Sequence, residues 1–277
     1  MELTDWSSGH IPDIMSLWRQ SRASETLTRS ELSTALAAGT VLATAEGTAA
    51  VAFAQGLGTA RQRGNIRLLM VASGQQQRGL GRELLGAAEA LLRARGVTTI
   101  RLAGGVPRYL WPGIDITNES ALALARSAGY RVHGHAVNMA LDTRFRAPAP
   151  DGVAVHPAHA VDVVRLRDFV ASLWPLWLTE FDIAAAQATL VGAWAGDRPV
   201  GFIAHSTMRQ GWIGPMGTDP DHQNQGIGVA LLAAVCTDLA ERGRDSADIA
   251  WVGPVDYFAA RGAKVSRHFE RFVKDVG

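Results

Sequence analysis

The amino-acid sequence predicts a mixed α/β protein of two similar halves, each with a mainly antiparallel sheet flanked by helices. The chain has 277 residues, against about 150 for an ordinary domain. A motif of the form Gln-x-x-Gly-x-Gly occurs twice, and in both halves strand-like and helix-like segments alternate around it. A proline-containing segment lies near the middle of the chain. These observations favour two tandem domains of one fold.

The repeated motif precedes a predicted helix in each half. The copies begin at Gln76 and Gln223, which are 147 residues apart (223 − 76). Apolar residues then recur at spacings of three and four, the pattern of one helix face. They are Leu84, Leu85, Ala88, Leu91 and Leu92 in the first half, and Ile227, Leu231, Val235 and Leu239 in the second. Each helix is expected to end at a glycine, Gly96 or Gly243.

Apolar and β-branched segments predict the strands around each helix. In both halves two strands form a hairpin, a third runs into the motif, and a fourth follows the helix. The expected strands are 40–45, 49–57, 66–72 and 98–103 in the first half, and 188–195, 200–206, 212–218 and 248–252 in the second.

The segment 145–152 predicts the domain boundary, because Pro148 and Pro150 cannot join a helix or a central strand. The expected domains are therefore 1–146 and 150–277. The first half has 14 more residues than the second around 106–113, since 33 residues separate Gly96 from Gly129 and 19 separate Gly243 from Gly262. Two interpretations of this insertion stay open: it shapes a substrate site, or it packs against the other domain.

Composition excludes several classes of function. With 27 basic and 26 acidic residues the net charge is +1, so no global field attracts nucleic acid or an anionic membrane. The single cysteine, Cys236, excludes an intramolecular disulfide and multi-cysteine metal sites. The pairs His133/His135 and His156/His159 lack acidic or cysteine neighbours in the sequence, so no metal is expected. The chain shows no leader and no apolar run of about 18 residues, which predicts a cytoplasmic protein without membrane contact.

A strand, a glycine-rich turn and a helix together form an anion-binding arrangement. The first helical turn leaves backbone N–H groups unpaired, the helix dipole adds positive potential, and glycine lets a phosphate approach. Arg82 follows Gly81 and Val229 follows Gly228, so neither copy is the Lys-Ser/Thr phosphate loop. The dinucleotide fingerprint, with three glycines after a first strand, does not fit either. A purely architectural turn is the alternative.

The two glycine turns resemble motif A of the GNAT acetyltransferase superfamily. The segment 216–232 is a close match, and the first copy lacks the acidic-proline step before its glutamine. The resemblance covers nearly the whole chain as two tandem domains. It implies acetyl-CoA as co-substrate and transfer of the acetyl group to a primary amine by direct attack.

The resemblance also implies which residues hold acetyl-CoA. In the second half Met216, Gly217 and Thr218 would pair with the pantetheine arm, and Asn224, Gln225, Gly226, Ile227, Gly228 and Val229 would hold the pyrophosphate. In the first half the matching positions are Leu69, Met70 and Val71, then Gln77, Arg78, Gly79, Leu80, Gly81 and Arg82.

Many family members carry a tyrosine four residues before a glycine near the domain's end, and it protonates the departing CoA thiolate. Ala125 stands at this position in the first half. In the second half Phe258 stands there and Tyr257 precedes it, so Tyr257 is the candidate acid, with a buried aromatic as the alternative.

A base must take the proton of the acceptor amine, because an alkylamine is mostly protonated near neutral pH. His205, on the strand before the second motif strand, is the candidate, and a structural histidine is the alternative. Glu180 and Asp182 are expected to be solvated, and Asp115 to cap the helix that follows it.

The sequence therefore favours an N-acetyltransferase of a small-molecule amine with its active site in the second domain, where the motif is fuller. The first domain is expected to be structural, although its turn is intact. Two alternatives stay open: a non-catalytic acyl-CoA-binding or scaffolding protein, and a protein or peptide N-acetyltransferase. The oligomeric state is open too.

Overall fold

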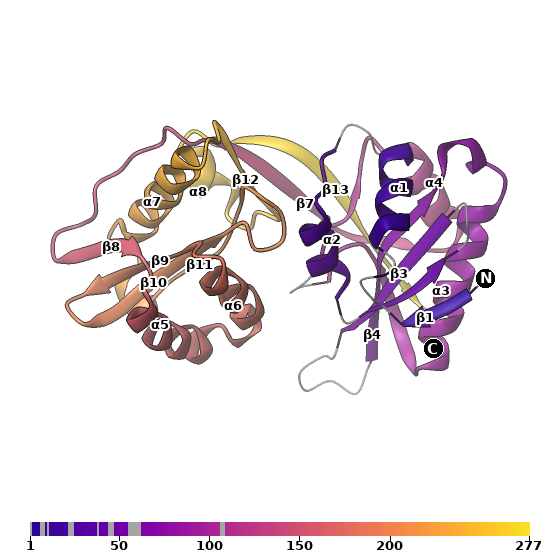
Figure 1. Cartoon of the computed structure of the whole chain (residues 1–277), viewed down its shortest axis with the longest axis horizontal. Coiled ribbons are helices and arrows are strands. Elements are labelled where there is room, and N and C mark those ends of the chain that lie inside the picture. The colour runs from indigo at the N-terminus through magenta and orange to yellow at the C-terminus, as the bar shows by residue number, and fades with distance from the viewer. Residues whose placement is uncertain are drawn as a thin grey trace. The chain divides into compact units, whose positions relative to one another are not determined.

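The chain forms two compact units, each built around its own part of the sheet (Figure 1). The computed structural model describes residues 2–5, 9, 11–21, 25–37, 39–43, 47–54, 62–105 and 109–277. Unit 1 comprises Met1–Ala136 and His268–Gly277, and unit 2 comprises Val137–Arg267.

Unit 1 is an antiparallel sheet with one parallel pair and helices on both faces. The strand order is β1-β2-β3-β4-β5-β13, and β6 also pairs with β13. Only β4 and β5 run parallel among the described strands of this unit. Its elements are β1 (Glu2–Asp5), α1 (Ile11–Ser21), α2 (Arg29–Leu36), β2 (Gly39–Ala43), β3 (Gly47–Ala54), β4 (Gln62–Val71), η2 (Ser73–Gln75), α3 (Leu80–Ala94), β5 (Val97–Leu102), β6 (Ile114–Asp115) and α4 (Glu119–Ser127).

Unit 2 repeats this plan. Its strand order is β7-β12-β11-β10-β9-β8, with β11 and β12 parallel and the other neighbouring strands antiparallel. Its elements are β8 (Val153–Pro157), α5 (Ala160–Leu173), η3 (Pro175–Trp177), α6 (Leu178–Ala186), β9 (Leu190–Ala195), β10 (Arg198–His205), β11 (Trp212–Thr218), η4 (Pro220–His222), α7 (Ile227–Glu241), β12 (Ser246–Ile249) and α8 (Val255–Ala259).

Two long strands belong to both units. β7 (Arg131–Asp142) begins in unit 1 and ends in unit 2, where it pairs with β12. β13 (Lys264–Asp275) begins in unit 2 and ends in unit 1, where it pairs with β5. In Figure 1 the yellow C-terminal strand accordingly ends among the elements of unit 1. Unit 1 is thus completed by β13 from the second half of the sequence, and unit 2 is completed by β7 from the first half.

This exchange corrects the expected division into residues 1–146 and 150–277. The segment 145–152 lies wholly inside unit 2 and joins β7 to β8. The prolines do interrupt regular structure, as expected, but the chain has already passed into unit 2 through β7. The compact units therefore change over at residues 136/137 and 267/268.

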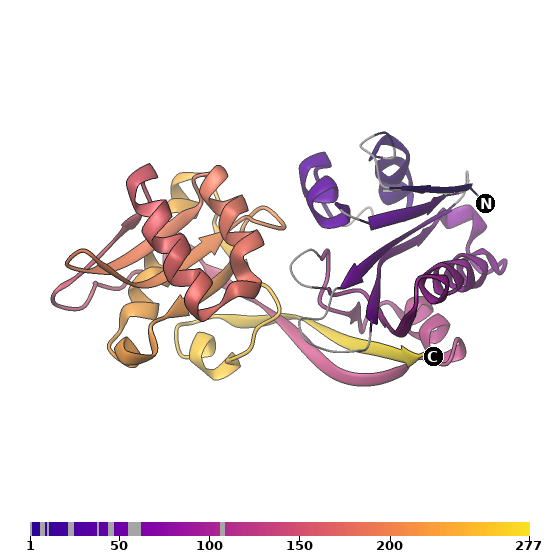
Figure 2. The same cartoon turned by 90° about the horizontal axis from the view of Figure 1, so that it is seen from below.

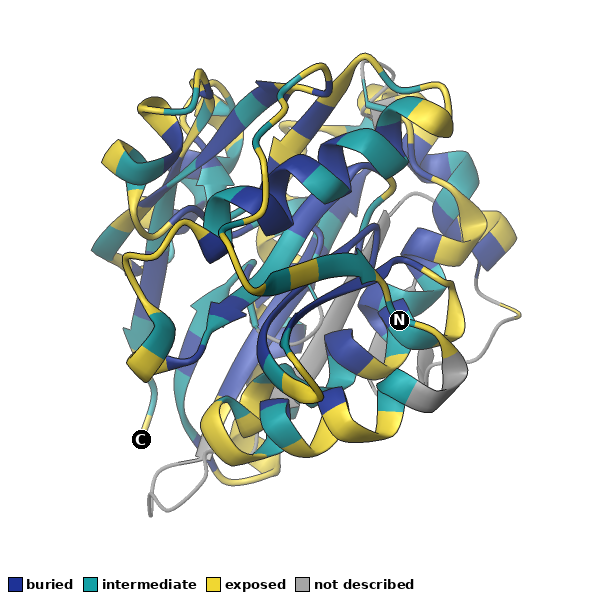
Figure 3. Ribbon diagram, turned by 90° about the vertical axis from the view of Figure 1, so that its left-hand side faces the viewer, coloured by how far each residue is buried: buried dark blue, intermediate teal, exposed yellow. Residues whose placement is uncertain are grey.

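Helices cover both faces of the sheet in unit 1, with α3 on one face and α1 and α2 on the other (Figure 2). The α3 side buries Leu84 and Leu92 with Ile66 and Ile100. In unit 2, α7 covers one face, and α5 and α6 cover the other. Buried residues concentrate in the strands and on the inward faces of these helices (Figure 3). The apolar periodicity read from the sequence is the buried face of α3 and α7.

Among the described residues, no helix is long and apolar enough to cross a membrane.

Candidate functional site

The two glycine turns have the same backbone conformation. Gly79 (φ +93°) and Gly226 (φ +87°) occupy the N-cap positions of α3 and α7, in the left-handed region that favours glycine. Two residues earlier, Gln77 and Asn224 also have positive φ angles, 61° and 60°. No side chain caps either helix, so the first-turn N–H groups face the turn. Both turns present unpaired N–H groups, the arrangement that holds anions at helix N-termini in many proteins.

In unit 1 the motif strand separates from its parallel neighbour. The register between β4 and β5 ends at Ile66 opposite Leu102, whereas β4 continues to Val71. The Ala103 N–H donates to the Ile66 carbonyl at 2.9 Å, and the strands diverge beyond this bond. The edge of β4 from Arg67 to Val71 is therefore not paired with β5.

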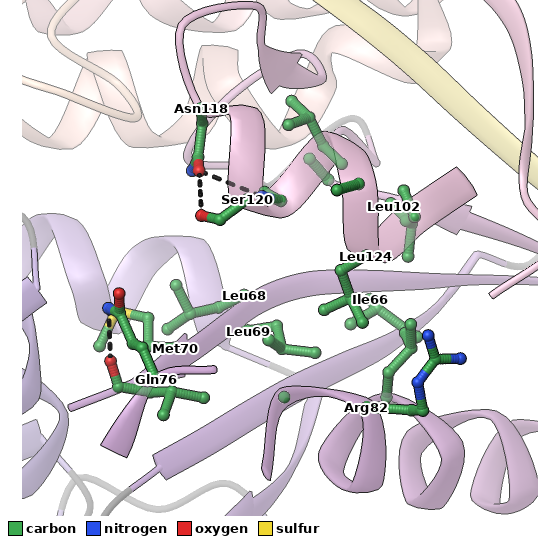
Figure 4. A pocket seen from close by; sticks show the side chains of 18 of the residues that line it. Ile66, Leu68, Leu69, Met70, Gln76, Arg82, Leu102, Asn118, Ser120 and Leu124 are labelled. Atoms are coloured by element: carbon green, nitrogen blue, oxygen red, sulfur yellow. Dashed lines mark hydrogen bonds between the residues drawn. The ribbon is translucent and has the colours of Figure 1, made fainter. Parts of the chain in front are cut away.

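A cavity of about 640 Å³ lies where these strands diverge and reaches the glycine turn (Figure 4). Its walls combine the end of β4, the first turn of α3, the end of β5 and helix α4. Leu68, Leu69 and Met70 face Asn118 and Ser120 across it in Figure 4. Gln76, Gln77, Gly79, Gly81 and Arg82 from the turn also line it. The cavity joins both parts of the motif that the resemblance assigned to acetyl-CoA.

The insertion 106–113 contributes to the same cavity. Trp111 and Gly113 are among the lining residues, and 106–108 lie outside the described residues. The Trp111 indole N–H donates to Glu25 Oε2 at 3.2 Å, and its ring stacks on Trp18 with centroids 5.3 Å apart. The insertion therefore shapes a wall of this cavity.

Arg82 places a positive charge at the turn. Its guanidinium donates to Ser127 Oγ at 2.7 Å and to the Ser127 carbonyl at 3.4 Å. Both residues line the cavity. The fixed guanidinium and the N-terminus of α3 create a positive potential at one end of an otherwise largely apolar space.

In unit 2, aromatic side chains lie against two glycines of the motif region. Gly217 and Gly228 correspond to Met70 and Gly81 at the repeat distance of 147 residues. A Cβ atom at Gly217 would lie 2.6 Å from the Trp174 ring, and one at Gly228 would lie 2.8 Å from the Tyr257 hydroxyl. At Gly81 the nearest atom to such a Cβ is Leu124 Cδ2, at 3.5 Å. At the capping glycines Gly79 and Gly226 such a Cβ would meet nothing within 4 Å, so the turns themselves are open in both units and the difference lies at Gly217 and Gly228.

Tyr257 thus lies at the turn of unit 2, close to where the family acid was expected. Its ring stacks under the Arg261 guanidinium, 3.7 Å away, and meets Phe258 edge-on. Burial raises the pKa of the phenol, against the smaller opposing effect of Arg261. The hydroxyl fills space at the helix N-terminus instead of lining an open pocket.

The position of His205 argues against its predicted role as the base. Its side chain is fully buried, Nε2 lies 2.6 Å from Asp238 Oδ2, and Nδ1 lies 3.0 Å from Ser206 Oγ. Burial lowers the pKa of His205 more than the Asp238 charge raises it. A ring enclosed in this way ties β10 to α7 and does not reach a substrate.

The three acidic residues considered in the sequence analysis lie in different surroundings. Glu180, expected in solvent, is buried in α6, because this residue lies on the face that packs on the sheet. Asp182 is at the surface as expected and pairs with Arg167 at 2.8 Å. Asp115 lines the cavity, and its Oδ1 accepts from the Thr117 N–H and hydroxyl. It does not cap α4: the Asn118 side chain does, by accepting from the Ala121 N–H.

Seven of the nine residues that the resemblance assigned to acetyl-CoA in the first half line the cavity, and Arg78 and Leu80 do not. Among the described part of the chain, no group of three or more His, Cys, Asp or Glu side chains could hold a metal ion. The sequence did not reveal that Trp174 lies against Gly217, because Trp174 occupies no special place in the repeat.

Comparison with known proteins agrees with this geometry. The model of the Acetyltransferase (GNAT) family matches residues 11–130 and 163–261, one match in each half. A search of curated proteins finds no match.

Solved structures share the fold over the whole chain. A GCN5-related N-acetyltransferase from Sphaerobacter thermophilus is 17% identical, with a TM-score of 0.71 over 99% of this chain and 95% of its own. A tandem GNAT protein from the clavulanic acid biosynthesis pathway is 16% identical, with a TM-score of 0.72 over 100% and 98%.

A third similar structure belongs to a larger protein. A GCN5-related glucosamine N-acetyltransferase region in a fungal multidomain GH3 β-N-acetylglucosaminidase is 18% identical, with a TM-score of 0.77. The match covers 99% of this chain and 38% of the fungal one. The family match, the two glycine turns and the repeated sheet lead to one conclusion: the chain belongs to the GNAT acetyltransferase family, as a tandem of two GNAT domains.

Proposed function

We propose that the protein is an N-acetyltransferase that binds acetyl-CoA in unit 1 and passes the acetyl group to the primary amine of a small molecule. The single observation that supports this assignment is the cavity at the diverging end of β4, which is continuous with the open glycine turn. This proposal moves the active site from the second half, which the sequence favoured, to the first.

The pantetheine arm would lie along the unpaired edge of β4, against Leu69, Met70 and Val71. The pyrophosphate would lie at the N–H groups of residues 77–82. Arg82, held by Ser127, would add a charge-assisted hydrogen bond to it. This arrangement uses the helix dipole and one fixed guanidinium.

The acceptor, as the free amine, would attack the thioester carbonyl carbon, the C–S bond would break, and CoA would leave as a thiolate. Water would take up the proton that the nitrogen loses as the amide forms. Ala125 stands where many family members have a tyrosine, so this side chain offers no proton. Water would protonate the thiolate. General acid help is typically worth about 10²–10⁴-fold, while positioning of the two reactants contributes more.

Unit 2 would be a structural partner. Trp174 covers the strand position and Tyr257 the turn position that acetyl-CoA would need. Binding there would require both side chains to move out of their packing with Phe202 and Phe258.

Binding of acetyl-CoA tests the proposal through a matched pair of glycines on α3. A Cβ at Gly81 meets only lining residues, at 3.5–3.9 Å, and one at Gly86 meets nothing within 4 Å. In a calorimetric titration we expect one equivalent of acetyl-CoA to bind the wild type. Gly81→Glu should weaken binding by at least about 30-fold, roughly 2 kcal/mol, because a carboxylate then faces the pyrophosphate. Gly86→Glu should bind like the wild type.

Release of CoA thiol with a panel of amines tests turnover in the same variants. Cys236 is fully buried and burial raises the pKa of its thiol to about 11, so it should not react with the thiol reagent. We expect Gly81→Glu to lose thiol release and Tyr257→Phe to keep it within about twofold. The opposite result, loss only in Tyr257→Phe, would return the active site to unit 2.

A second candidate, a non-catalytic acyl-CoA-binding protein, is favoured by Ala125 alone. It predicts that acetyl-CoA binds but that no amine accelerates thiol release. Aminosugars belong in the panel because one similar structure is a glucosamine N-acetyltransferase region. A peptide with a free N-terminus covers the remaining alternative.

A further inference from the structure

Three arginines form a diagonal row across neighbouring strands of unit 1. Arg63 lies on β4, Arg101 on β5 and Arg271 on β13. Arg63 pairs with Thr99, two residues before Arg101, and Arg101 pairs with Val273, two residues after Arg271. Side chains two apart on a strand share a face, and diagonal neighbours lie about 7–8 Å apart. The three side chains therefore share one face of the sheet.

This face is the one opposite to α3. Phe272 and Leu102 pair with each other, alternate with the arginines and are buried under α3. Arg101 and Arg271 are half-buried on the other face, and Arg63 is exposed.

The arginine row concentrates like charge. Burial lowers the pKa of Arg101, and the positive charges of Arg63 and Arg271 lower it further. Burial lowers the pKa of His133, and the charges of Arg271 and Arg101 lower it further. Among the described residues of unit 1, ion pairs with carboxylates are formed by Arg93, Arg126, Arg131 and Lys274. Neither Arg63 nor Arg101 forms such a pair there. Asp275, opposite Thr99, is a carboxylate on the same face and pairs with Arg131. The like charges of Arg63 and Arg101 repel each other, and an added anion would reduce that repulsion.

The row also lies beside the cavity. Arg101 directly precedes Leu102 and Ala103, and its β4 partner Asn65 directly precedes Ile66 and Arg67. These four following residues line the cavity where the strands diverge. An acceptor that approaches the thioester from the face opposite to α3 would pass the arginines.

We propose that Arg63, Arg101 and Arg271 bind an anionic group, a carboxylate or a phosphate, on the acceptor amine. This inference rests on the proposed function of unit 1 and narrows the acceptor to amines that carry such a group. Planar guanidinium groups match both anions through paired N–H donors. Anchoring the anion would hold the amine at the gap between β4 and β5.

Matched acceptors test the preference. Lysine and cadaverine differ by one carboxylate, and glucosamine 6-phosphate and glucosamine differ by one phosphate. We expect kcat/KM for the anionic member of at least one pair to exceed that of its neutral partner by at least about tenfold. Arg101→Gln and Arg271→Gln should remove this ratio by raising the acceptor KM, and leave the KM for acetyl-CoA unchanged. The pair that shows the ratio identifies the anion.

The control is Arg144→Gln, which removes an exposed arginine of unit 2 that pairs with Asp142. It should keep the preference. Equal kcat/KM within both pairs in the wild type, or the same ratio in Arg101→Gln, would overturn the proposal.

An anion titration separates this inference from the proposed function. Sodium phosphate and sodium acetate, against sodium chloride of equal ionic strength, should raise the Tm of the wild type more than that of Arg101→Gln. In chloride alone Arg101→Gln should unfold at a higher Tm, because like charges are relieved. If no amine releases thiol, the proposed function fails, and these Tm shifts still decide the anion site. Equal shifts in both proteins would overturn it.

Discussion

At the scale of single residues, equivalent glycines have different surroundings. Gly81 and Gly228 occupy the same position of the motif, yet a leucine lies near one and a tyrosine hydroxyl near the other. The motif describes only the backbone of a turn, and side chains from α4 or α8 decide what lies beside its second glycine. Leu124 and Tyr257 occupy matching positions, five residues before Gly129 and Gly262, and they are the neighbours of Gly81 and Gly228.

His205 gives a pH-dependent prediction at this scale. Burial lowers its pKa below the ordinary value of 6.5, so the folded ring is neutral. The unfolded ring takes up a proton as the pH falls through about 6.5, so the unfolded state then binds more protons and stability decreases. We expect the unfolding free energy to fall between about pH 7.5 and about pH 5.5, and to fall less in His205→Gln. Urea unfolding of both proteins measures this, and identical pH dependence would contradict it.

At the scale of elements, the helix that follows each glycine turn is defined at both ends. Gly79 and Gly226 start α3 and α7, and Gly96 and Gly243, both with φ +78°, follow their last turns. The sequence predicted these ends because positive φ angles favour glycine.

Gly86, inside α3, and Gly96, just after its end, test whether glycine is favoured only where φ is positive. Gly86 is exposed in the helix interior, where glycine is unfavourable, so Gly86→Ala should raise the unfolding free energy by about 0.5–1 kcal/mol. Gly96→Ala should lower it by about 1 kcal/mol, because alanine disfavours a positive φ. Denaturant midpoints of the two variants measure this. Stabilisation by both substitutions would refute the role of Gly96.

At the scale of the molecule, the C-terminal residues of the chain complete the unit that holds the proposed site. Phe272 on β13 is 1% exposed and packs against Ile66, Leu84 and Ile100. The sequence suggested that this strand belonged to the second domain.

Two substitutions in β13 test this exchange. Phe272→Ala should destabilise unit 1 by about 3–5 kcal/mol and reduce the fraction of protein that binds acetyl-CoA. Val265→Ala, at an exposed position of the same strand, should change stability by less than about 0.5 kcal/mol. Thermal unfolding with and without acetyl-CoA compares them. If Phe272→Ala left acetyl-CoA binding and stability unchanged, the contribution of β13 to unit 1 would be refuted.

The sequence by itself determined the repeat, the strand–turn–helix at each motif, the ends of α3 and α7, and the family. These features depend on local backbone preferences and on apolar periodicity, which nearby residues specify. Only the tertiary structure decided that β7 and β13 cross between units, that His205 and Glu180 are buried, and that side chains lie against Gly217 and Gly228. These outcomes depend on side chains that meet from distant parts of the chain, such as Trp174 on Gly217 and Tyr257 on Gly228. A single sequence contains no signal for such contacts, because spacing along the chain does not report distance in space.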